Sequence, residues 1–254
     1  NLSNTLNLYF YMTPFKKYLP TNDILGPKHV NSGYSSIGTR EGEIVIFRKE
    51  EWFKVLIHET FHSFGLDFAR MSQGRINKKF KNIFPINSEF NIFEAYTESW
   101  AEIINSVFIS YHLIRKKKVE VRRKEFFKFS RYCLEIEKIF SLYQCVKILK
   151  YMGLTYSNLY TKDEQSMYAR QTCYRENTNV FSYYILTAIL MNNYIGFMDW
   201  CNDENISLLK FHSNQRSLDS FYDYVVSQYK SSNLLQNLKY ITEPFTIKEF
   251  TSRE

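Results

Sequence analysis

The 254-residue sequence contains little glycine and proline, with eight and five residues respectively. These residue types form turns and interrupt helices, so their scarcity favours long helices and argues against a turn-rich β-sandwich. The sequence also lacks any run close to the roughly 20 consecutive apolar residues that a membrane-spanning helix requires. We therefore predict a protein rich in helix with no membrane span.

Cysteine is also sparse, and the four residues are widely separated: Cys133, Cys145, Cys173 and Cys201. No C-x-x-C pair occurs, which argues against a cysteine-based zinc site. Isolated cysteines of this kind are typical of buried thiols in an intracellular protein, while two disulfides would also fit the sequence.

The chain is basic, with 33 lysines and arginines against 26 aspartates and glutamates, a net charge of +7. Much of the excess lies in residues 115–124. A basic run can contact nucleic acid or an anionic surface, but a solvated helix end or loop is the commoner explanation. No recognised nucleic-acid module accompanies this segment, so nucleic-acid binding is the less favoured function.

One short motif dominates residues 55–65, the sequence His58-Glu59-x-x-His62. Residues four apart share one face of a helix, so His58 and His62 can bind one metal ion. Glu59 projects one step round and can act as a base without being a ligand. The apolar residues around the motif predict a buried helix, and Gly65 is a natural C-terminal cap. Two buried structural histidines are the alternative explanation.

A second informative stretch is residues 87–114, where apolar residues recur at helical spacing. Glu94, Glu98 and Glu102 lie within it at four-residue steps and share one face. A solvent-exposed face usually explains such a stripe. A catalytic zinc ion, however, needs three protein ligands and a water. Beside an H-E-x-x-H helix, one of these glutamates is therefore a candidate third ligand.

The remaining patterns predict an α+β fold. Residues 7–12, 29–36 and 43–47 are rich in β-formers, and the last two predicted strands lead into the motif helix. Residues 66–85 predict irregular structure or a short helix. Further helices are predicted over residues 124–151, 177–196 and 217–229. No linker divides the chain, so we predict one domain over 1–254, with 1–114 holding a small twisted sheet and both metal-site helices, and 115–254 helical.

Strands that lead into an H-E-x-x-H helix resemble the zincin metallopeptidases, and the resemblance covers residues 43–110. It implies a small sheet packed on the active-site helix, with an edge strand that pairs with an extended peptide substrate. Residues 97–104 are similar to the E-x-x-x-[DE] helix of the gluzincin branch. That similarity implies Glu98 as the third ligand and Glu102 as the acid that orients a histidine. Glu94 and Glu98 fit the same pattern as the alternative pair.

The chain departs from the family in its spacing, since 35 residues separate His62 from Glu98. This spacing is closer to the long-spacer branch that includes the clostridial neurotoxin proteases than to the thermolysin-like branch. Gly65 also matches the glycine of the metzincin motif. The metzincin ligand would then fall on Phe68, which cannot bind zinc, and Asp67 is the alternative one residue earlier.

The function that the resemblance implies is zinc-dependent hydrolysis of a peptide or protein substrate, by a metal-activated water with Glu59 as general base. The oxyanion needs a further hydrogen-bond donor. The candidate donors are Tyr183, Tyr184, Arg175 and His212. A catalytically silent zincin-like structural or binding protein is the alternative, against which the intact Glu59 argues.

The composition and residues 52–68 also resemble uncharacterised zincin-like proteins of large DNA viruses. The scattered cysteines slightly favour an intracellular protein over a secreted one, and a virus-encoded protein of this kind would lie in the host cytoplasm or the virion. The sequence does not determine the oligomeric state or the substrate.

Overall fold

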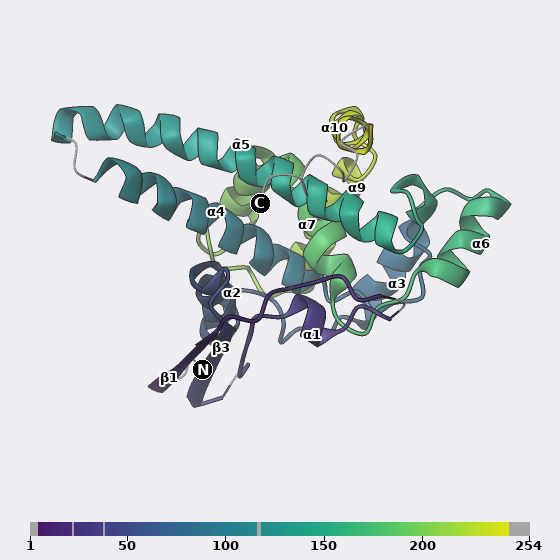
Figure 1. The fold of residues 1–254 in the computed structure, drawn as a ribbon, viewed down its shortest axis with the longest axis horizontal. Helices are drawn as coiled ribbons and strands as arrows, with labels where there is room; N and C mark the ends of the chain where they lie inside the picture. The colour runs from purple at the N-terminus through teal and green to yellow at the C-terminus, as the bar shows by residue number, and fades with distance from the viewer. Residues whose placement is uncertain (1–4, 22, 38, 116–117, 244–254) are drawn as a thin grey trace.

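The computed structural model describes residues 5–243 except 22, 38, 116 and 117. It confirms the α+β class, with a small N-terminal sheet followed by helices (Figure 1). The sheet contains β1 (Thr5–Thr13), β2 (Gly33–Ser35) and β3 (Glu41–Arg48) in the order β1-β3-β2. Strand β1 is parallel to β3, whereas β2 is antiparallel to it. Strand β3 is therefore central, and β2 forms one edge of the sheet.

The strands predicted at 7–12 and 43–47 are confirmed, but the one predicted at 29–36 is largely wrong. Residues Pro27–Val30 form the short helix α1, and only Gly33–Ser35 pair as a strand. Proline at the first helical position favours this turn, because its fixed φ suits a helix and its missing N–H is not needed there. The ring of His29 adds to the turn by accepting a hydrogen bond at Nδ1 from the Gly26 N–H, at 3.1 Å.

Glycine at position 33 allows β2 to lie close both to β3 and to the helix of residues 52–64, which contains the H-E-x-x-H motif. A Cβ atom at Gly33 would lie 2.7 Å from the carbonyl oxygen of Val45 and 2.8 Å from Cγ1 of Val55. Both distances are too short for any side chain, so only glycine fits without a shift of the backbone. Close packing here places Ser35, two residues further along β2, within reach of the motif helix.

The motif helix α2 (Trp52–Phe64) follows β3, as predicted. Gly65 ends it in the left-handed conformation with φ +59°, and its N–H bonds to the carbonyl of His62. The helix begins at Trp52, because Glu51 before it has φ +58° and does not form its first turn. The Glu51 carboxylate instead accepts a hydrogen bond from Lys17 Nζ at 2.9 Å.

Helices make up most of the rest of the chain. Those predicted from residues 87, 124 and 217 are confirmed with shifted ends, whereas α10 was not predicted. Residues 177–196 do not form one helix, since the Asn193 side chain caps a new helix by accepting from the Gly196 N–H. The elements after α2 are α3 (Gly74–Ile83), α4 (Ile92–Ile114), α5 (Val119–Tyr151), the 3-10 helix η1 (Ser157–Leu159), α6 (Glu164–Cys173), the π-helix η2 (Phe181–Leu186), α7 (Thr187–Asn192), α8 (Tyr194–Glu204), α9 (Gln215–Gln228) and α10 (Ser232–Thr242).

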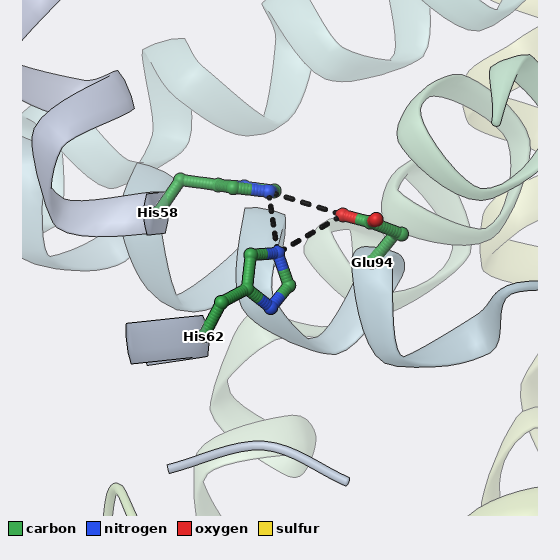
Figure 2. A group of neighbouring side chains, drawn as sticks. All are labelled: His58, His62 and Glu94. Carbon is green, nitrogen blue, oxygen red and sulfur yellow. Dashed lines mark hydrogen bonds and ion pairs between the residues drawn. The ribbon is translucent and has the colours of Figure 1, made fainter. Parts of the chain in front are cut away.

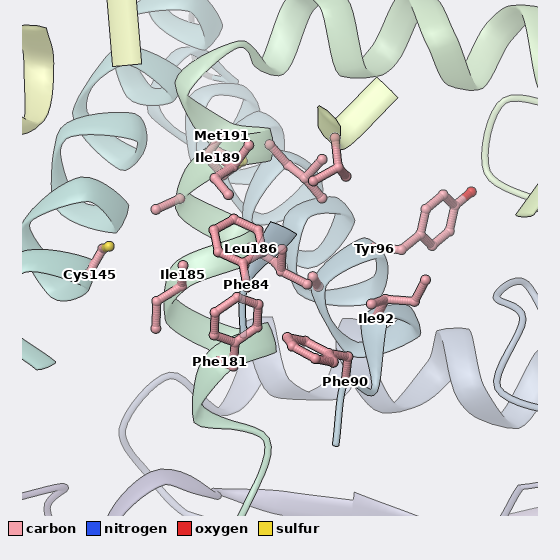
Figure 3. Packing of buried hydrophobic residues seen from close by; sticks show 14 of the residues in the cluster. Phe84, Phe90, Ile92, Tyr96, Cys145, Phe181, Ile185, Leu186, Ile189 and Met191 are labelled. Atoms are coloured by element: carbon pink, nitrogen blue, oxygen red, sulfur yellow. The ribbon is translucent and has the colours of Figure 1, made fainter. Parts of the chain in front are cut away.

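The main hydrophobic core lies among these helices, around η2 and α7 (Figure 3). Phe181 of η2 packs on the rings of Phe84 and Phe90, whose centroids lie 5.1 and 4.9 Å away. Helix α4 contributes the buried residues Ile92 and Tyr96 to the same core. This packing holds the first turns of α4 in place, so its polar residues are presented to α2 in a defined register.

None of the described helices is long and apolar enough to cross a membrane. The four cysteines are free thiols.

We predict that Gly33→Ala lowers the free energy of unfolding by about 1–3 kcal/mol, because the new methyl group overlaps backbone and side-chain atoms. Urea denaturation measures the difference. Gly74→Ala is the matched control, since nothing lies within 4 Å of a Cβ added at that helical position. Equal stability of the two variants would contradict the close approach of β2.

Candidate metal centre

Three buried side chains from α2 and α4 converge on one point (Figure 2). Nε2 of His58 lies 3.1 Å from Oε2 of Glu94, and Nε2 of His62 lies 3.2 Å from the same oxygen. The two Nε2 atoms lie 3.1 Å apart. The histidines therefore share one face of α2, as the motif predicts, and the first turn of α4 closes the group.

Each histidine is oriented through its other ring nitrogen. Nδ1 of His58 lies 2.8 Å from Oε2 of Glu98, and Nδ1 of His62 contacts Oδ2 of Asp67. An ionised carboxylate only accepts hydrogen bonds, so each Nδ1 donates. In the neutral imidazole this leaves Nε2 as an acceptor with its lone pair directed at the shared point.

The Glu94 carboxylate is also held in one orientation. Nδ2 of Asn179 donates to Oε1 of Glu94 at 3.1 Å, and Nδ2 of Asn91 donates to Oδ1 of Asn179 at 2.7 Å. Asn179 thereby occupies the outer oxygen of Glu94. The inner oxygen, Oε2, is left to face the two histidines.

The convergence of three acceptor atoms requires positive charge between them. Burial alone would lower the pKa of His58, but the hydrogen bonds to Glu94 and Glu98 outweigh it and raise the pKa to about 9. Burial is likewise outweighed at His62, whose pKa is raised by Asp67 and Glu94. The pKa of Glu94 falls to about 2, because the histidines outweigh its burial. The site therefore attracts cations, and protons would compete with a metal ion for it.

The third group beside the two histidines is Glu94, and not the Glu98 that the family resemblance implied. The candidate ligand set is therefore corrected to His58, His62 and Glu94. Glu98 lies one turn further along α4, on the Nδ1 side of His58, and so orients that histidine. The alternative reading of the E-x-x-x-E pattern, Glu94 followed by Glu98, fits the geometry. Asp67 contacts the Nδ1 of His62 and is not one of the converging groups, so it too is an orienting residue.

Lys54, one turn before His58 on α2, keeps Glu98 ionised. Its ammonium group forms an ion pair with Oε1 of Glu98 and lies 3.8 Å from the carboxylate of Glu51. Burial would raise the pKa of Glu98, but Lys54 and His58 hold it far below the usual range. Glu98 therefore stays a carboxylate that can accept the Nδ1 proton of His58.

Glu102 was expected to orient a histidine, and it does not. Its side chain is 6% exposed, and Oε2 has no hydrogen-bond partner among the described residues. Burial raises the pKa of Glu102 well above its usual value, and the nearby Glu137 and Glu98 add to the rise. Burial therefore favours the protonated form of Glu102, whose side chain lines the same cleft as His58 and Glu59.

The candidate base Glu59 is buried beside His58 and contacts the edge strand. The Ser35 hydroxyl of β2 donates to Oε2 of Glu59 at 2.7 Å. Both His58 and Glu59 line a cleft of about 230 Å³, which Gly33 of β2 also borders. The cleft therefore runs between the sheet edge and the helices α2 and α4.

Tyr183 and Tyr184 both line this cleft, whereas Arg175 and His212 do not. The ring of Tyr183 lies 5.9 Å from that of His58. Burial, with Glu94 nearby, raises the pKa of Tyr183, so its hydroxyl stays protonated and can donate a hydrogen bond. Tyr183 is thus the better placed of the two predicted oxyanion donors.

Several residues at the site carried no clear signal in the sequence. Asn179, Ser35 and His29 come from segments without a recognisable motif, and only the fold brings Asn179 to Glu94, Ser35 to Glu59 and His29 to the cleft. His29 is buried and lines the cleft, and its Nε2 has no partner in the part of the chain that is described. Lys54 could have been found, because it lies four residues before His58 on the same helical face.

No family model matches the chain, and no solved structure matches it. The chain is similar to "Uncharacterized protein R210" of Acanthamoeba polyphaga mimivirus, with 29% identity over 205 residues. The match covers 78% of this chain and 50% of that protein, so the chain spans about half the length of its viral relative. The similarity is to a viral protein whose name assigns no activity.

We predict that Glu102→Gln removes a pH-dependent loss of stability. A carboxyl with a raised folded pKa binds more protons folded than unfolded, so its stabilising effect is lost as pH rises above its unfolded pKa of about 4.5. In metal-free protein, thermal unfolding should show similar stability of variant and parent at pH 5. By pH 8 the variant should be more stable, by about 1 kcal/mol or more.

Glu89→Gln, the same substitution at an exposed position, is the matched control. A difference between Glu102→Gln and the parent that stays constant from pH 5 to pH 9 would contradict a neutral Glu102.

Proposed function

We propose that this chain is a zinc-dependent peptidase. The observation that supports the proposal best is the convergence of His58, His62 and Glu94, with Nε2, Nε2 and Oε2 only 3.1–3.2 Å apart. Ligand atoms at the usual 2.0–2.1 Å from a tetrahedral zinc ion lie about 3.3 Å from one another. Two imidazoles and one carboxylate, with a fourth position open, are a ligand set of hydrolytic zinc sites. The residues present therefore fit zinc.

The side chains around the three candidate ligands also favour metal binding. Each histidine donates its Nδ1 proton to a carboxylate, Glu98 or Asp67, which sets the tautomer that a metal ion requires. Zinc, when bound, would polarise the substrate carbonyl and lower the pKa of a water molecule.

Glu59 is the residue that moves protons in this proposal. The Ser35 hydroxyl occupies Oε2 of Glu59, so Oε1 is the oxygen placed to accept a proton from the attacking water. The same carboxyl would then deliver that proton to the leaving amine. The Tyr183 hydroxyl, protonated and in the same cleft, would donate a hydrogen bond to the oxyanion.

The position of β2 supports a peptide as the substrate. Strand β2 pairs with β3 on one side and forms the sheet edge on the other, and the cleft runs beside it. An extended peptide can add to such an edge through backbone hydrogen bonds. This would align the peptide with Glu59, which Ser35 of the same strand contacts.

We predict an order of zinc affinity for three identical substitutions along α4. Glu94→Gln removes a ligand and should cost the most. Glu98→Gln disturbs only the orientation of His58 and should weaken binding by about 10- to 100-fold. Glu102→Gln should have little effect. Competition with a chromophoric chelator measures each affinity, and an equal loss in Glu94→Gln and Glu98→Gln would contradict the ligand assignment.

We predict that Glu59→Gln keeps its zinc but loses about 10²–10⁴-fold in the rate of peptide cleavage, because the general base is gone. A peptide library digested by the zinc-loaded protein and analysed by mass spectrometry gives the activity, and metal analysis gives the zinc content. Unchanged cleavage by Glu59→Gln would refute its role. A zinc-loaded parent that cuts no peptide would favour the silent binding protein.

A further inference from the structure

The net charge of the protein is concentrated in one segment. Residues 115–131 contain nine lysines and arginines and two glutamates, a net charge of +7. This equals the net charge of the whole chain, so the remaining residues hold 24 basic and 24 acidic side chains. A charge separation this complete creates a strongly positive region on an otherwise balanced molecule.

The described residues of this segment lie at the end of α4 and in the first part of α5. The two helices lie side by side, and their connected ends project away from the rest of the molecule (Figure 1). We call residues 108–115 and 118–131, at the end of α4 and the start of α5, the hairpin tip. Its position leaves the hairpin tip accessible to a large flat surface (Figure 1).

The hairpin tip also exposes large apolar side chains. Phe127 is 62% exposed and Leu113 is 61% exposed, and Ile109, Tyr111 and Val121 are exposed as well. Arg123, Phe127 and Arg131 follow one another at four-residue steps on α5, so they share one face, and all three are exposed. Apolar and basic side chains are therefore interleaved on the same surface.

The presence of both basic and apolar side chains helps to decide between nucleic acid and an anionic bilayer as the partner. Phosphates of nucleic acid attract the basic residues, and bases stack on aromatic rings, but exposed leucine, isoleucine and valine gain nothing there. The surface of an anionic bilayer accepts both kinds of side chain. Lysine and arginine bind the headgroups, while apolar side chains enter the boundary of the acyl chains.

We propose that the hairpin tip binds the surface of anionic lipid bilayers. This proposal does not depend on the metal site. It would, however, set the distance of the cleft from the membrane, since α4 carries both Leu113 in the tip and Glu98 in the cleft. Fifteen residues of helix at 1.5 Å each separate Glu98 from Leu113 by roughly 20 Å along α4.

Vesicle sedimentation tests the proposal with the full chain. The protein should bind vesicles of phosphatidylcholine with phosphatidylserine, should not bind pure phosphatidylcholine, and should dissociate as salt is raised. The variant Arg123→Glu/Lys124→Glu should lose binding. The variant Leu113→Ser/Phe127→Ser should bind at least about tenfold more weakly, because its apolar contribution is removed.

The matched control combines the same kinds of change on exposed residues elsewhere, Lys210→Glu/Tyr240→Ser, and should bind like the parent. Thermal unfolding of each variant checks that it is folded. Failure of the parent to bind, or equal binding to neutral vesicles, would overturn the proposal. So would RNA binding that the charge variant weakens and the apolar variant does not, or a dimer in solution that the apolar variant dissociates.

Discussion

The candidate metal centre depends on two hydrogen bonds between imidazoles and carboxylates. Glu98 and Asp67 each accept the Nδ1 proton of one histidine, and this forces both Nε2 lone pairs toward the Glu94 carboxylate. Three acceptors so close together repel one another unless a cation lies between them. The pKa values of both histidines are raised for the same reason, because a proton bound to either ring supplies positive charge among these acceptors when no metal ion is bound.

The rest of the fold supplies the forces that keep this arrangement in place. Helix α4 is anchored in the helical core through Ile92 and Tyr96, so Glu94 and Glu98 meet α2 in a fixed register. Lys54 then keeps Glu98 ionised within a buried site. On the other side the sheet edge reaches Glu59 through Ser35, which the missing side chain of Gly33 permits. The core and the sheet thus position different halves of the same cleft.

The candidate site and the excess positive charge lie at opposite ends of the helices α4 and α5. The near ends of α4 and α5 border the cleft, while their far ends carry the net positive charge and the exposed apolar side chains. In the proposed arrangement the helices act as rigid spacers between a lipid surface and a peptide-cleaving site. A substrate would then be a protein held at, or close to, a membrane.

The local sequence was sufficient for features that depend on neighbours along the chain. Helical periodicity placed His58 and His62 on one face, predicted α4, and aligned Glu94, Glu98 and Glu102, while Gly65 marked the end of α2. Which of the three glutamates meets the histidines depends on how α4 packs across α2, and a four-residue repeat looks the same after a shift of one turn. Only the tertiary structure decided for Glu94, and it buried Glu102, whose Oε2 has no hydrogen-bond partner among the described residues. Asn179, Ser35 and His29 reach the site by long-range packing, which no local pattern records.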